Sequence, residues 1–140
     1  MKTIYHCLIM WTPFILLFGL AGFGLEFLEG NKIRTSEYMG LSDLGVGYLF
    51  LKGSLAFVLY PITFLPLTFI VSKFVKPLLL KMLTFSSFGG ILGVFSFFIY
   101  DSSHIDEYNL SITNSITLFG VAGLLYALVE NPIRRNIKFV

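Results

Sequence analysis

Charged side chains are scarce in this sequence, where they make up 13% of 140 residues against about 25% in an ordinary soluble domain. Hydrophobic residues make up 56%, and the mean hydropathy is +0.82. A small soluble protein has too much surface for its volume to bury so much apolar area. The composition therefore excludes a disordered chain, a nucleic-acid-binding protein and an ordinary cytosolic enzyme, and it predicts an integral membrane protein.

Reactive groups are also scarce. Cys7 is the one cysteine, so an intramolecular disulfide is excluded, and no part of the sequence gathers enough ligands for zinc. The sequence has no serine nucleophile with a suitably placed histidine and acid, and it has no glycine-rich phosphate loop. No pair of carboxylates lies within an apolar run. We therefore expect no enzymatic activity, no catalytic residue, no cofactor and no metal site.

Four apolar runs are long enough to cross a hydrocarbon core about 30 Å thick as helices, which requires roughly 20 residues each. They cover residues 4–25, 48–72, 82–100 and 110–129. No segment alternates polar and apolar residues, as the strands of a transmembrane barrel do. The sequence thus predicts one all-α domain over residues 1–140, an integral membrane bundle of four transmembrane helices. The first run is longer than a signal-peptide core of about 7–15 residues, which favours an uncleaved helix over a cleaved signal peptide.

The connections between the runs differ in charge. On the side opposite the termini, Lys32 and Arg34 lie between the first two runs, and Lys52 lies at the edge of the second. Seven of the eight acids lie on that side too. Basic connections stay in the cytoplasm, so we expect both termini to be cytoplasmic, in a protein of the cell membrane. Lysine outnumbers arginine seven to three, which is typical of a bacterial, AT-rich gene. The basic residues on the side of the termini are Lys2, Lys73, Lys76, Lys81, Arg134, Arg135 and Lys138.

Prolines mark two places where regular helix is disfavoured. Pro61 and Pro66 lie inside the second run, where each removes a backbone donor, so a kink is expected near the middle of the membrane. Pro132 follows the fourth run and is expected to mark the end of that helix.

Lys52 is the candidate intramembrane polar residue, because an ionisable group inside a span is costly and is a functional candidate by default. If the second helix begins at Gly53, Lys52 reaches the outer head groups by snorkelling. If the helix begins near Leu44, Lys52 is buried and needs a partner, such as Asp43 or Asp101. Snorkelling is the favoured interpretation.

Small residues recur at four-residue spacing in the third run and are also frequent in the fourth. Small side chains let membrane helices approach closely where lipid supplies no hydrophobic drive. We expect these residues to pack helix against helix rather than to bind a ligand, in a bundle centred on the third helix. The candidate packing residues are Ser86, Gly89, Gly90, Gly93, Gly120 and Gly123.

The remaining polar residues receive modest expectations. His6 and Cys7, near the inner end of the first run, are expected to be packed or interfacial side chains. Glu130 is expected to pair with Lys81 or Arg134 at an exposed surface, where an ion pair contributes little. Residues 101–107 hold three carboxylates and a histidine that could bind a divalent metal, but a solvated turn is favoured.

The sequence therefore favours a non-enzymatic membrane protein that acts through helix contacts, as an accessory subunit or as an immunity or stress factor. The alternative is a homo-oligomeric transporter or channel, with Lys52, the Pro61/Pro66 region and hydroxyls of the third run lining a path. The expected partners are the lipid bilayer and either another membrane protein or a second copy of the chain. No nucleic acid is expected to bind.

Overall fold

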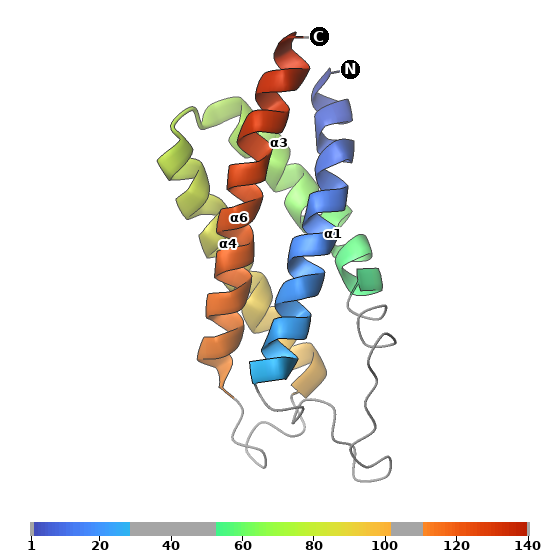
Figure 1. The fold of residues 1–140 in the computed structure, drawn as a ribbon, viewed down its shortest axis with the longest axis vertical. Coiled ribbons are helices and arrows are strands. Elements are labelled where there is room, and N and C mark those ends of the chain that lie inside the picture. Colours follow the sequence, from blue (N-terminus) through green and yellow to red (C-terminus); the bar gives the residue numbers. More distant parts are fainter. Residues whose placement is uncertain (1, 29–52, 102–110, 140) are drawn as a thin grey trace.

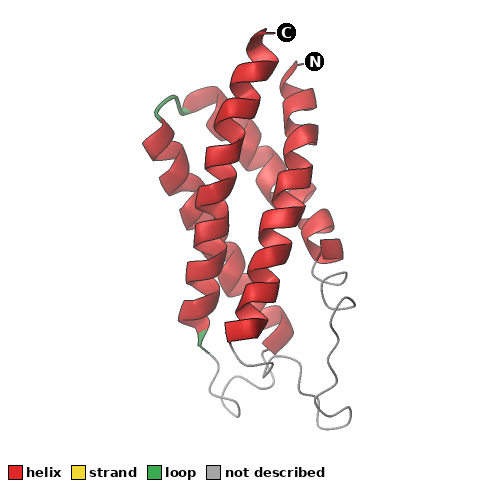
Figure 2. Ribbon diagram, viewed as in Figure 1, coloured by secondary structure: helices red, strands yellow, loops and turns green. Residues whose placement is uncertain are grey.

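The computed structural model describes residues 2–28, 53–101 and 111–139, and all their regular structure is helical (Figures 1 and 2). The helices form an elongated bundle in which α1 (Lys2–Leu28), α4 (Leu78–Asp101) and α6 (Ile112–Phe139) run for most of its length. The start of α1 and the end of α6 lie at the same end of the bundle (Figure 1). The turn that connects α3 (Leu65–Phe74) to α4 lies at this end too, which we call the terminal end.

Four stretches of helix are long and apolar enough to cross a membrane. They are Ile4–Leu25, Gly53–Phe74, Leu78–Phe98 and Ile112–Asn136. Many of their large apolar side chains point outward, including Leu16 and Leu20 of α1, each 60% exposed. Such an exterior is costly in water and suited to lipid. The four helices therefore indicate a multi-pass membrane protein.

The second span is not a uniform α-helix. A π-helical turn, η2 (Tyr60–Phe64), precedes α3, and the backbone N–H of Leu65 bonds to the carbonyl of Tyr60 five residues earlier. Pro61 has no N–H to donate to the carbonyl of Phe57. The indole Nε1–H of Trp11 donates to that carbonyl instead, at 3.1 Å. A kink is expected at the prolines, and the structure has a π-helical turn there, with a side chain of α1 bonded to the carbonyl that Pro61 leaves free.

The prediction that Pro132 ends the fourth helix is wrong, since α6 continues through it to Phe139. A proline inside a helix removes one donor without always ending the helix, especially where tertiary contacts hold both sides. Here Val129 and Ile133, on either side of Pro132, both pack against the core. The continuation carries Arg134 and Arg135 on helix at the terminal end.

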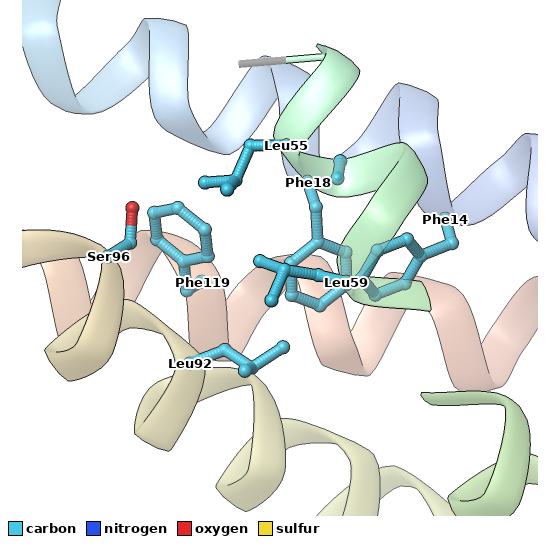
Figure 3. Close-up of a pocket in the computed structure, with 8 residues that line it drawn as sticks. Phe14, Phe18, Leu55, Leu59, Leu92, Ser96 and Phe119 are labelled. Atoms are coloured by element: carbon cyan, nitrogen blue, oxygen red, sulfur yellow. The ribbon is translucent and has the colours of Figure 1, made fainter. Parts of the chain in front are cut away.

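Aromatic rings fill the centre of the bundle. Phe14 of α1 lies 4.7 Å from Phe64, measured between ring centroids, and Tyr126 of α6 lies 5.2 Å from Phe64 and 5.1 Å from Phe85 of α4. All four side chains are fully buried. Beside them is a cavity of about 20 Å³, room for about one water molecule (Figure 3). It is lined by Phe14, Phe18, Leu55, Ala56, Leu59, Leu92, Ser96 and Phe119.

Helices α4 and α6 make the most extensive contact among the described elements. A Cβ atom added at Gly89 would overlap the carbonyl oxygen of Phe119, and one added at Gly123 would overlap that of Phe85. At Gly93 the same atom would lie 2.7 Å from the carbonyl oxygen of Ser115. Only glycine permits backbones to approach this closely, so these three residues set the distance between the two helices.

Candidate functional site

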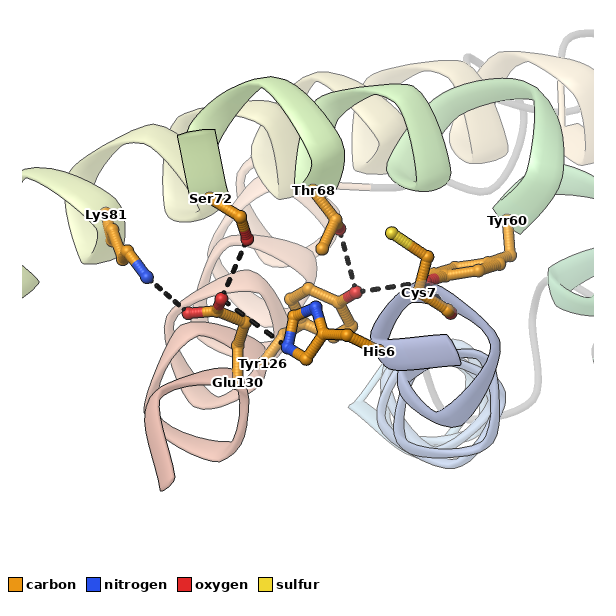
Figure 4. Close-up of polar contacts among 8 residues, drawn as sticks. All are labelled: His6, Cys7, Tyr60, Thr68, Ser72, Lys81, Tyr126 and Glu130. Atoms are coloured by element: carbon orange, nitrogen blue, oxygen red, sulfur yellow. Dashed lines mark hydrogen bonds and ion pairs between the residues drawn. The ribbon is translucent and has the colours of Figure 1, made fainter. Parts of the chain in front are cut away.

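A buried ion pair joins α4 to α6 near the terminal end of the bundle. Lys81 Nζ donates to Glu130 Oε2 at 2.6 Å, and the two residues are 2% and 0% exposed (Figure 4). Both lie within about two helical turns of the end of their candidate spans. Two charges at this depth, shielded by protein, mark a site of structural or functional importance.

The expected pairing of Glu130 with Lys81 is confirmed, whereas its expected exposure is wrong. The apolar run that begins at residue 82 places Lys81 in the connection before the third helix, but α4 already begins at Leu78 and carries Lys81 in its first turn. From there the lysine side chain points into the bundle toward Glu130 (Figure 4). The pair is therefore removed from water, and the modest energy of a surface ion pair does not apply to it.

Two further residues contact the Glu130 carboxylate. Ser72 Oγ, at the end of the second span, donates to Glu130 Oε1 at 2.9 Å. His6 Nε2 of α1 lies 3.6 Å from the same oxygen, beyond hydrogen-bonding distance, and has no hydrogen-bond partner. His6, Ser72, Lys81 and Glu130 thus bring all four spans together, and we call them the polar cluster.

Three hydroxyl groups form a second arrangement deeper in the bundle, the hydroxyl chain of Thr68, Tyr60 and Tyr126 (Figure 4). Tyr60 donates to the carbonyl of Cys7 at 2.6 Å, and Tyr126 donates to the Tyr60 oxygen at 3.4 Å. Because the Tyr126 hydrogen is used there, Thr68 donates to the Tyr126 oxygen, at 2.9 Å. These bonds satisfy buried hydroxyls while linking α1, the second span and α6.

The polar cluster and the hydroxyl chain differ in what they can do chemically. The cluster holds an ammonium, a carboxylate and an imidazole in contact, so it can gain or release a proton. The hydroxyl chain is fully bonded and uncharged, and it positions helices. Within the described residues, no group of three or more histidine, cysteine, aspartate or glutamate side chains could hold a metal ion.

A groove of about 600 Å³ runs between α4 and α6 on the outside of the bundle. Gly90 and Gly120 contribute no side chains to its lining, and the exposed residues Ser87 and Thr117 carry hydroxyl groups. The Thr117 hydroxyl donates to the carbonyl of Thr113 in its own helix, at 2.7 Å. A Cβ atom at Gly90 would meet Ile116, and one at Gly120 would meet Ser86 at 3.6 Å. The lining residues, which define the α4/α6 groove, are Ser86, Ser87, Gly90, Ile91, Val94, Ile116, Thr117, Gly120, Val121 and Leu124.

The candidate packing residues divide between two locations. Gly89, Gly93 and Gly123 lie between α4 and α6, as described above. Ser86, Gly90 and Gly120 line the α4/α6 groove. The small residues therefore serve a contact inside the bundle and also shape its outer surface.

Several candidates lie outside the described residues. Lys52, with its possible partner Asp43, precedes the described part of the second span, so neither the snorkelling nor the buried interpretation is tested. Residues 102–107, including the histidine of the acidic loop, also lie outside it.

The polar cluster is not apparent as a unit in the sequence. His6 is expected from the sequence to be a packed or interfacial side chain, and no role is expected for Ser72, Thr68, Tyr60 or Tyr126. The one signal was that Glu130 and His6 both lie at the terminal ends of apolar runs. A pairing across 49 residues, such as Lys81 with Glu130, is not visible in the sequence of either helix.

The comparisons with known proteins are negative: no protein-family model matches the sequence, and no curated protein or solved structure matches it significantly. The function of this chain is therefore argued from the geometry of its four-helix bundle.

Proposed function

We propose that this chain is a multi-pass protein of the bacterial cell membrane, with both termini in the cytoplasm, that acts without catalysis through helix contacts. Its partner would be a transmembrane helix of another membrane protein, which it would serve as an accessory subunit or as an immunity or stress factor. The α4/α6 groove is the observation that carries this proposal.

The groove suits a transmembrane helix for three reasons. Gly90 and Gly120 remove side chains from its floor, which lets a visiting backbone come close. The exposed Ser87 hydroxyl would donate across an interface between helices, where lipid offers no hydrogen-bond partner. The Thr117 hydroxyl already donates to a carbonyl of its own helix, so its oxygen would act there as an acceptor. The rims carry exposed apolar side chains, Ile91 at 51% and Val121 at 53%, which would pack around the visitor.

The filled interior favours a role through surfaces over a path through one chain. Phe14, Phe64, Phe85 and Tyr126 close the centre of the bundle, and the cavity beside them has a volume of about 20 Å³. A transported solute would have to displace these rings, and tightly packed aromatic contacts make that displacement costly. Surface contacts require no such movement.

Photo-crosslinking in the native membrane tests the proposal. A photoreactive amino acid at Ile91, in the groove, should yield one discrete adduct with another membrane protein. The matched control is Leu20 on α1, which is 60% exposed, lies outside the groove and should yield none. Equal adducts at both positions, or none at Ile91, would refute the groove as a docking surface.

The polar cluster favours a second candidate function, a homo-oligomeric transporter or channel coupled to protons. Ionisable groups inside membrane bundles commonly line ion or proton pathways, and Lys81, Glu130 and His6 are such groups. Purified protein in liposomes should then carry a proton flux that Glu130→Gln abolishes, and the groove adduct should be a dimer of the chain itself. A flux equal to that of empty liposomes would exclude this candidate.

A further inference from the structure

The side chain of His6 stands out in the bundle as a buried polar group without a partner. It is 4% exposed, and its Nε2 is the one buried side-chain nitrogen or oxygen among the described residues without a hydrogen bond. Buried polar atoms nearly always have a hydrogen-bond partner, because an atom without one loses its hydrogen bonds to water and gains none in the protein. An exception in such a place calls for a physical reason.

The surroundings of Nε2 supply that reason. The Glu130 Oε1 atom lies 3.6 Å away, and it already accepts the hydroxyl of Ser72 at 2.9 Å. The other carboxylate oxygen is held by Lys81 at 2.6 Å. An approach of less than 1 Å would turn the Nε2–Oε1 contact into a hydrogen bond of ordinary length, about 2.7–2.9 Å for a charged pair.

We propose that His6 is a proton-binding site, and that the bound proton closes this gap by forming an Nε2–H hydrogen bond to Glu130 Oε1. In the neutral state the contact is long, as described. In the protonated state the imidazolium faces a carboxylate with a lone pair still free to accept, so that the proton draws the start of α1 toward α6. The site thus responds to pH at the terminal end of the bundle.

Burial and the charged groups around His6 act in opposite directions on its protonation. Burial opposes the imidazolium, Glu130 on α6 favours it, and Arg134 on α6 and Lys81 on α4 oppose it. Ser72 of the second span contributes a hydroxyl and no charge, and Cys7, the ionisable residue that follows His6 in the sequence, lies on α1. The Lys81–Glu130 pair is neutral overall, so the bound proton gives the cluster one net positive charge.

This site is distinct from the α4/α6 groove, and it stands whether or not the groove binds a helix. Protonation at His6 would change how firmly α1 is held, since its terminal end would gain a charge-assisted bond to α6. Two other polar bonds connect α1 to the second span, one from Tyr60 to the Cys7 carbonyl and one from Trp11 to the Phe57 carbonyl.

The test is a pH titration of the His6 ring by nitrogen NMR in lipid nanodiscs. The sequence has two histidines, so His104→Gln leaves His6 as the single labelled imidazole. Its two ring nitrogens should convert to the doubly protonated form as the pH is lowered from about 8 to about 4. A spectrum that does not change over this range would overturn the proposal.

Two variants identify the origin of that titration. Glu130→Gln removes the negative charge, so protonation should require a lower pH than in the wild-type cluster. Ser72→Ala frees Oε1 of its hydroxyl donor, so protonation should occur at a higher pH, and this variant carries the test if Glu130→Gln does not fold. Thr68→Val, in the hydroxyl chain, is the matched control and should leave the midpoint in place. Equal midpoints for Ser72→Ala and the wild-type cluster would overturn the proposal.

Discussion

Replacing either member of the Lys81–Glu130 pair should destabilise the bundle severely, and replacing both should destabilise it less than either alone. Lys81→Met leaves the Glu130 carboxylate buried without its ammonium partner. Glu130→Gln leaves the Lys81 ammonium buried without its carboxylate, while the amide can still accept from Ser72. The double variant leaves no uncompensated charge.

The size of the effect follows from burial. Lys81 and Glu130 are 2% and 0% exposed, so neither charge regains water when its partner is lost. Breaking a buried pair on one side costs about 3–5 kcal/mol, whereas an exposed pair contributes about 0–1 kcal/mol. The double variant leaves no uncompensated charge, so the remaining cost is that of the unfilled hydrogen bonds of the introduced amide, which is smaller. The two single effects should therefore be strongly non-additive.

Equilibrium unfolding in mixed micelles provides the assay, and Trp11 provides the signal. It is the single tryptophan, its ring stacks on Phe57 at 4.6 Å between centroids, and its indole bonds to the Phe57 carbonyl. Its fluorescence therefore reports separation of α1 from the second span. Single substitutions that each cost under about 1 kcal/mol and add in the double variant would show an exposed pair and refute the reasoning.

Other substitutions and fusions test the packing, the hydroxyl chain and the orientation. Gly123→Ala should cost about 1–3 kcal/mol in the same unfolding assay because its Cβ overlaps the Phe85 carbonyl oxygen, whereas Gly19→Ala, with open space at its Cβ, should cost nothing. Equal effects at the two glycines would contradict the packing argument. Tyr60→Phe removes the hydrogen bond to the Cys7 carbonyl and should cost about 0.5–1.5 kcal/mol; no loss would mean that this bond contributes nothing. Green fluorescent protein fused after the last residue should fluoresce, because the C-terminus is expected in the cytoplasm; active alkaline phosphatase at that position would contradict it.

Hydropathy alone predicted the helical architecture because each span must satisfy its own backbone and present apolar side chains along about 20 residues. The prolines of the second span likewise pointed to irregular helix, and a π-helical turn is present there at Tyr60–Phe64. These features are local, since a short window of sequence contains their cause.

The polar cluster could not be predicted in the same way because its cause is tertiary. The sequence alone places Lys81 in a loop, but in the structure α4 begins at Leu78 and the Lys81 side chain bonds to Glu130. Pro132 alone predicts the end of a helix, but α6 continues past it, and Val129 and Ile133 on either side pack against the core. In both places, contacts between distant segments outweigh the local preference.

Native mass spectrometry of the protein, extracted in mild detergent at its natural level of expression, tests the proposed function most directly. A stoichiometric complex with another membrane protein is expected, and Gly120→Leu, which fills the α4/α6 groove, should abolish it. Leu20→Phe, on the exposed face of α1, should leave it intact. A homo-oligomer would instead favour the transporter or channel, and a lone monomer, or a complex that survives Gly120→Leu, would contradict docking in the groove.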